Sequence, residues 1–150
     1  MRQVFLDCID WIDSIRLLDA LRSWLAEKTK SWEETVADIA KVAPNFPQTA
    51  YSGLQKSLQQ EWQFVQRVTK GIGHEFQDVE LALAKTFLPT LFGDNFDKTD
   101  PRRKLSGLPV KWAGLAIPDP TAVSADLNYA VSRYLATPLS YYFGRLSSDT

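Results

Sequence analysis

At 150 residues, with 45% hydrophobic and 12% aromatic residues, the chain is long enough to bury a core and too apolar to be disordered. Its net charge of −1 excludes a strong overall field for nucleic acid or membrane, and its one cysteine, Cys8, excludes an internal disulfide. Asp7, Asp10 and Asp13 stand where a signal peptide would be apolar. No apolar run approaches the ~18 residues of a membrane span. We expect one intracellular domain over residues 1–150, cytoplasmic or nuclear, neither secreted nor bound to a membrane.

The first predicted helix covers residues 3–27, where Trp11 and Trp24 widen an apolar stripe. The stripe consists of Val4, Cys8, Ile12, Ile15, Leu18, Leu21 and Leu25. A second helix is predicted to begin at Ser31, because Ser31 and Glu34 have the spacing of a capping box. Its buried side is predicted to consist of Trp32, Val36, Ile39 and Ala43.

The stretch 50–73 predicts the central helix of the fold, spanning about 48–70. Pro47 suits its first turn and Gly71 its end. Its buried stripe is predicted to be Tyr51, Leu54, Leu58, Trp62, Val65 and Val68. Its polar face carries Lys56, Gln59, Gln60, Gln63, Arg67 and Lys70. Glu61 falls on the apolar side, so its carboxylate needs a partner or a place at the margin of the core.

The next helix is predicted to begin near His74 and to be kinked or restarted by Pro89. Its core face is predicted to be Phe76, Val79, Leu83 and Phe87. A short helix should follow Asp100 and Pro101. A Pro/Gly-broken extended segment is then predicted at 108–118, packing Trp112, Leu115 and Ile117.

Asp119 and Pro120 have the N-cap and first-turn pattern of another helix. That helix is predicted to bury Val123, Leu127, Ala130 and Tyr134. Pro138 should start a last short piece that ends at Leu146. The predicted fold class is therefore all-α, with five or six helices around the central one.

Chemical motifs are scarce. His74 and Asp78 are four residues apart and share a helix face with Glu75 nearby, but no third strong metal ligand accompanies them. The acids suit the first turn of a helix, which is the simpler interpretation. Cys8 lies on a predicted apolar face, away in sequence from histidine, and is expected to be buried. We predict no cofactor and no metal.

Positive charge gathers at 98–112, which holds five Lys or Arg residues, one acid and Trp112. Such a segment could contact phosphates and stack on a base, or it could be a solvated loop. With the cations of the central helix, the candidate nucleic-acid-binding residues are Lys56, Arg67, Lys70, Lys98, Arg102, Arg103, Lys104, Lys111 and Trp112.

Four segments stand in order along the chain: WLAEKTKSW (24–32), VADIAKVAPNFPQTAYSGLQKSLQQEWQFVQRVTKGIG (36–73), VELALAKTFLPTLFG (79–93) and GLPVKWAGLAIPDPT (107–121). Together they resemble the region that follows the reverse-transcriptase palm in polyproteins of eukaryotic retroelements, over residues about 24–137. The resemblance implies a thumb-like or connecting element beside the template and primer. It would give the cations a role in contacting the RNA or DNA backbone.

The chain departs from that family in one decisive motif. Polymerisation needs palm aspartates that hold two divalent ions, and this sequence contains no Asp-Asp pair. Residues 1–23 do not resemble the end of a palm and are expected to be a leader helix, and the tail 138–150 stops where more helix would be expected. We therefore expect a non-catalytic retroelement-derived fragment with weak, sequence-independent nucleic-acid binding at most. The alternative is a helical module that binds a protein, the missing palm or a second copy of itself, through an apolar surface such as the Trp11/Trp24 side.

Overall fold

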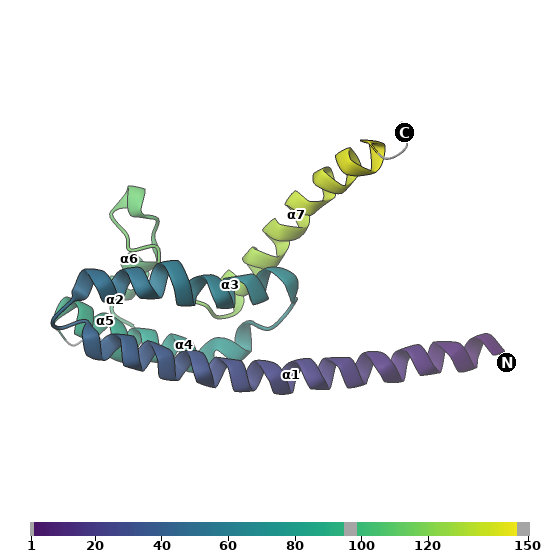
Figure 1. The fold of residues 1–150 in the computed structure, drawn as a ribbon, viewed down its shortest axis with the longest axis horizontal. Helices are drawn as coiled ribbons and strands as arrows, with labels where there is room; N and C mark the ends of the chain where they lie inside the picture. The colour runs from purple at the N-terminus through teal and green to yellow at the C-terminus, as the bar shows by residue number, and fades with distance from the viewer. Residues whose placement is uncertain (1, 95–98, 147–150) are drawn as a thin grey trace.

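The computed structural model describes the backbone of residues 2–94 and 99–146, and the side chains of residues 16–94, 99–121 and 123–136. Over these ranges the chain is built from helices, turns and loops without a strand, which confirms the all-α class. Three helical rods lie side by side, and a long helix leaves them at an angle (Figure 1). Among the described residues, no helix combines the length and the apolar character needed to cross a bilayer.

The first rod is the single helix α1 (Arg2–Val42), so the predicted break before Ser31 is wrong. Thr35 Oγ1 donates to the Ser31 carbonyl at 2.8 Å, a contact typical of a helix interior and not of a cap. The run before Ser31 consists mainly of good helix formers, which carry the helix through the capping-box motif.

Only the C-terminal half of α1 lies against the body, while the N-terminal half extends beyond it (Figure 1). Leu25 is buried, but Leu18 of the predicted stripe is 52% exposed. The buried apolar residues are Leu25, Trp32, Val36 and Ala40 on α1 and Ala43 just after it. The side chains of Val4, Cys8, Trp11, Ile12 and Ile15 lie outside the described residues.

The second rod is the predicted central helix, formed by α2 (Pro47–Gly53), a π-helical turn (Leu54–Leu58) and α3 (Gln59–Val68). The expected stripe is buried at Leu54, Leu58, Trp62 and Val65, and Tyr51 packs at its edge. Two expectations are wrong. Val68 is 60% exposed, since the helix ends there, and Gln59 of the polar face is buried.

The third rod comprises a 3-10 turn (Gly73–Phe76), α4 (Gln77–Ala82), a second π-helical turn (Leu83–Phe87) and α5 (Leu88–Phe92). Its predicted core face is confirmed, with Phe76, Val79, Leu83 and Phe87 each fully buried. Pro89 lies in the first turn of α5, where its missing N–H costs little. The rod ends at Gly93, whose φ of 70° suits glycine.

An aromatic cluster joins the three rods. Trp32 of α1 stacks on Phe76 with ring centroids 5.9 Å apart and meets Trp62 of α3 edge-on at 6.3 Å. The indole Nε1 of Trp32 donates to Glu61 Oε2 at 3.1 Å. Glu61 thus has both features expected of it, because it is exposed at the margin of the core and its carboxylate is hydrogen-bonded.

The last part of the chain comprises α6 (Pro101–Gly107), a 3-10 turn (Val110–Trp112) and α7 (Ala122–Leu146). Asp100 caps α6 as predicted, accepting from Arg102 N at 2.8 Å. The segment 108–118 is not extended throughout, because the 3-10 turn interrupts it, and Trp112 is exposed while Ile117 is buried. Two boundaries of α7 differ from expectation: it begins at Ala122, after Asp119 and Pro120, and it continues past Pro138 without a restart.

Candidate interaction site

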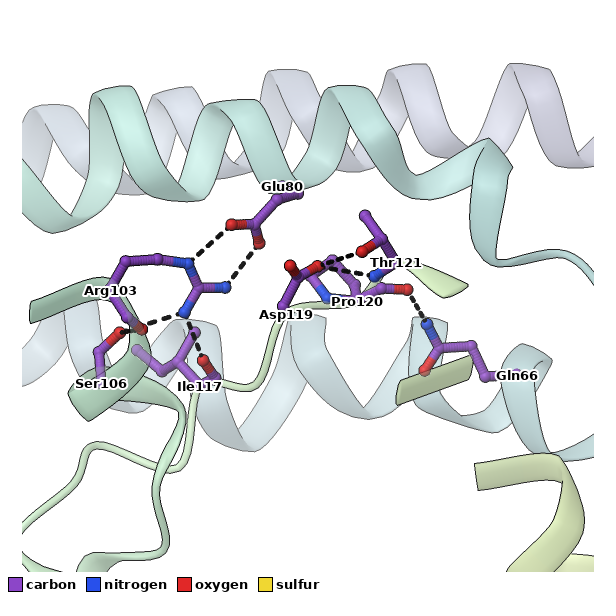
Figure 2. Close-up of polar contacts among 8 residues, drawn as sticks. All are labelled: Gln66, Glu80, Arg103, Ser106, Ile117, Asp119, Pro120 and Thr121. Carbon is purple, nitrogen blue, oxygen red and sulfur yellow. Dashed lines mark hydrogen bonds and ion pairs between the residues drawn. The ribbon is translucent and has the colours of Figure 1, made fainter. Parts of the chain in front are cut away.

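A buried ion pair fixes the C-terminal part of the chain to the rods. Arg103 of α6 donates from Nε to Glu80 Oε1 at 2.8 Å and from Nη2 to Glu80 Oε2 at 2.6 Å (Figure 2). Both side chains are at most 5% exposed. Nη1 donates to Ser106 Oγ at 3.1 Å and to the Ile117 carbonyl at 2.9 Å. The guanidinium therefore has a partner for each of its nitrogens, which is the condition under which a buried charge is tolerated.

A second set of contacts holds the chain just before α7. Gln66 Nε2 of α3 donates to the Pro120 carbonyl at 2.7 Å (Figure 2). Gln66 Oε1 accepts from Asn128 Nδ2 of α7 at 2.8 Å. Gln66 is 1% exposed, so one buried amide joins α3 to both the entry and the first turns of α7.

The same strap of chain is held at two further carbonyls. Tyr51 Oη donates to the Leu115 carbonyl at 2.8 Å, and Gln59 Nε2 donates to the Ala116 carbonyl at 3.0 Å. Together with the Arg103 and Gln66 contacts, these bonds fix the strap 115–121 against α2 and α3. The direction in which α7 leaves the body is therefore set by buried polar side chains.

A hollow of about 470 Å³ opens beside the ion pair. Its lining includes Glu80 and Arg103, which are already bonded to each other, and the exposed residues Lys104 and Asp119. Asp119 Oδ1 in turn accepts from Thr121 N at 2.9 Å (Figure 2). Glu80, Arg103 and Asp119 in the lining of the hollow thus all form hydrogen bonds within the fold.

The predicted basic cluster at 98–112 is not a single cationic surface. Arg103 is buried, and Arg102 forms ion pairs with Asp94 and Asp100, each at 2.7 Å. Hydrogen bonds from Arg102 lower the pKa of Asp100, and the two aspartates raise that of Arg102 above its ordinary value. Lys98 lies outside the described residues.

The remaining candidate cations are exposed but dispersed. Lys104 lies at the rim of the hollow beside the ion pair, and Lys111 stands on a loop with its Nζ 4.8 Å from the Trp112 ring centre. Lys56 and Arg67 on the second rod, and Lys70 just after it, are all exposed. Arg67 Nη2 donates to Gln63 Oε1 at 3.4 Å.

The loop between α6 and α7 projects from the body (Figure 1). Its base is closed by backbone hydrogen bonds from Leu115 N and Ile117 N to the Ser106 carbonyl, at 3.2 and 3.0 Å. Ala113 and Ala116 adopt positive φ angles of 62° and 52°, which L-residues rarely do. This ordered loop holds Val110 and Trp112 61% and 63% exposed.

The largest difference from the sequence prediction is on α7. Val123, Leu127, Ala130 and Tyr134, which were expected to be buried, are exposed. The helix instead buries Ala125, donates from Asn128 to Gln66 of α3, and contacts both α3 and the 3-10 turn Gly73–Phe76. We call the outward face the α7 stripe, defined as Val123, Leu127, Val131, Tyr134 and Leu135, with exposures of 83, 61, 47, 78 and 57%.

Comparisons with protein-family models, with curated proteins and with solved structures returned no match. Among the described residues, no group of three or more His, Cys, Asp or Glu side chains is arranged to hold a metal ion. Exposed features of the described residues include the α7 stripe, the loop that carries Trp112, and the cations Lys56, Arg67 and Lys70 on or just after the second rod.

Proposed function

We propose that the chain is a non-catalytic helical module of the kind that follows a reverse-transcriptase palm, and that it works by binding another polypeptide. The observation that carries this proposal is the α7 stripe, in which five large apolar side chains on one helix face are each about half exposed or more. Contiguous apolar surface of this kind on a soluble domain is typical of binding sites for other proteins.

Two features support this function over catalysis. The sequence lacks the paired aspartates that polymerisation requires, and the buried acid Glu80 is bonded to Arg103. The buried polar side chains serve instead to fix the start of α7. A rigidly positioned helix loses little conformational entropy when its outward face binds a partner.

The proposal is tested by placing a photo-crosslinking amino acid at position 127, in the cell that expresses the chain. Polypeptides bonded to that position are then identified by mass spectrometry. The matched control is position 110, because Val110 and Leu127 have the same exposure of 61% but lie on different surfaces. We expect a discrete crosslinked polypeptide from 127 and none at that mass from 110. Absence of any adduct at 127 would reject the proposed function.

A second candidate function is weak binding to a nucleic-acid backbone, for which Lys56, Arg67 and Lys70 are the best residues. All three are exposed, Lys56 and Arg67 on the second rod and Lys70 just after it. Glutamate at all three positions should abolish binding to single-stranded RNA, and the binding of the native chain should weaken steeply between ~50 and ~200 mM salt. Arg103 is unsuited to such a test, because its replacement would disrupt the core.

A further inference from the structure

A small cavity lies between α1 and the turn that joins the second rod to the third, near the point where α1 leaves the body (Figure 1). Its volume is about 90 Å³, which is enough for several water molecules or a short aliphatic chain. The apolar part of its lining comes from both elements and consists of Leu18, Leu21, Leu25 and Ile72. Leu25 and Ile72 are buried and Leu18 is half exposed, so this apolar lining runs from the core to the surface.

Two cations line the same cavity. Arg22 comes from α1 and Lys70 from the turn, and both residues are exposed. Within the part of the chain that the structure describes, neither side chain forms a hydrogen bond or an ion pair. Two like charges at one cavity repel each other, and an anion bound between them would be attracted by both.

The remaining ionisable groups of the lining set the charge of the ligand. His74 Nε2 lies 2.9 Å from Glu75 Oε1, so the acid of the described lining already has a partner. When the imidazole is neutral, Arg22 and Lys70 against Glu75 leave one unit of positive charge. A monoanion would neutralise this charge, whereas a phosphate dianion would leave an excess negative charge beside an apolar surface.

We propose that this cavity binds a small monoanion in which a carboxylate is joined to a short branched aliphatic group. The aliphatic group packs against Leu21, Leu25 and Ile72, where it replaces water next to apolar surface. The carboxylate lies between Arg22 and Lys70, because the planar guanidinium suits a carboxylate and the ammonium adds a second charge. The site shares no residue with the α7 stripe, so the inference does not depend on the proposed function.

Two sources could present this chemistry: a free branched-chain acid, and the C-terminal residue of a peptide. Isocaproate serves as the probe for the free acid. N-acetyl-leucine serves as the probe for the peptide end, because it carries the same isobutyl group and carboxylate with one acetamido group added. Comparing the two probes therefore distinguishes the sources.

The first experiment titrates the purified full chain, without an affinity tag, with each probe. His74 is the single histidine of the sequence and lines the cavity, so its imidazole proton signal in NMR reports on this site. We expect isocaproate to shift that signal with a dissociation constant on the order of 1 mM, as suits a ligand of so few atoms. Isocaproamide lacks the charge and acetate lacks the aliphatic group, so each should bind at least ~10-fold more weakly.

The second experiment repeats the titration with variants, using calorimetry as a readout that does not depend on His74. Arg22→Gln and Lys70→Gln should each raise the dissociation constant for isocaproate ~10-fold, since each removes a charged partner of the carboxylate. Leu21→Phe fills the cavity and should abolish binding while both cations remain. The matched control is Lys28→Gln, because Lys28 is an exposed cation of the same helix that does not line this cavity, and binding should be unchanged. Circular dichroism should show that each variant keeps its helical content.

The outcomes separate cleanly. The inference is overturned if neither probe binds at up to ~10 mM, if isocaproamide binds as well as isocaproate, or if Lys28→Gln weakens binding as much as Arg22→Gln does. Heat of binding without a shift of the His74 signal would place the ligand elsewhere and would also overturn it. If N-acetyl-leucine binds more tightly than isocaproate, the inference holds with a peptide end as the source, and the opposite order supports a free acid.

Discussion

Helices α3 and α7 carry similar apolar stripes but end in opposite environments. The stripe of α3 faces α1 and the third rod, so that Trp62 is 1% exposed. The stripe of α7 faces solvent, and Leu127 is 61% exposed. The difference shows that helical periodicity identifies an apolar face, whereas the elements around it decide whether that face stabilises the fold or remains for a partner.

The largest expected effect comes from the polar contacts that join α6 to the rods. Arg103→Ala leaves the Glu80 carboxylate buried without its ion-pair partner, which should cost about 3–5 kcal/mol in the free energy of unfolding. Urea denaturation measures the loss. Lys104→Ala, at an exposed neighbouring position, should change the free energy by under ~0.5 kcal/mol. If Arg103→Ala destabilised the chain no more than this control does, the Arg103–Glu80 ion pair would not stabilise the packing of α6 against the rods.

A pair of leucine truncations tests the comparison of α7 with the second rod directly. Leu54→Ala removes a fully buried side chain and should cost about 2–5 kcal/mol. Leu127→Ala should change monomer stability by less than ~0.5 kcal/mol, because most of that side chain is already in water. Thermal unfolding at low micromolar concentration compares them. Equal losses would mean that the α7 stripe is covered within one chain.

Glycine substitutions distinguish the ordered loop from the rods. A Cβ at Gly114 would lie 2.0 Å from the Leu108 carbonyl oxygen, so Gly114→Ala should destabilise the chain by about 1–3 kcal/mol. Gly53 has no atom within 4 Å of an added Cβ and is helical, so Gly53→Ala should gain about 0.5–1 kcal/mol. Unfolding midpoints in urea should move in opposite directions, and a shared direction would contradict the loop geometry.

The smallest effect concerns pH. Arg102 lowers the pKa of Asp100 below its ordinary value of 3.8, so the folded chain holds this proton less tightly than the unfolded chain does. The resulting stability is complete above that value and is lost as pH falls through the lower pKa of the folded state. Asp100→Asn should remove this part of the acid dependence while keeping an acceptor for the cap of α6. If Asp100→Asn left the acid unfolding curve unchanged, Asp100 would contribute nothing to the dependence of stability on pH.

The rods were largely predictable from sequence, because buried apolar residues at helical steps report directly on a packed face. This holds for Leu54 through Val65 and for Phe76 through Phe87. The sequence prediction was wrong at Ser31. A capping motif lies there inside a run of good helix formers, and no residue nearby ends the helix that has already begun.

The candidate site was harder to predict because it depends on contacts between distant residues. Arg103 and Glu80 are 23 positions apart, so charge counting alone placed Arg103 on a surface when it belongs to the core. Val123, Leu127 and Tyr134 of the α7 stripe were predicted to lie on an apolar face, but their exposure depends on the hydrogen bond by which Asn128 is held to Gln66 of α3. A hydrogen bond between two amide side chains 62 residues apart leaves no periodic signal in the sequence.

The π-helical turn at Leu54–Leu58 sets the rotational phase between α2 and α3, because such a turn holds one residue more than the regular helix needs. Tyr51 and Gln59 lie on either side of the turn. The rotational phase lets them donate hydrogen bonds to the neighbouring carbonyls of Leu115 and Ala116. Deleting one residue here would still allow an unbroken second rod. Tyr51 would, however, be rotated by about 100° around the helix axis and would lose its hydrogen bond to the Leu115 carbonyl. We therefore expect the π-helical turn at 54–58 to tolerate side-chain substitutions more readily than the insertion or deletion of a residue.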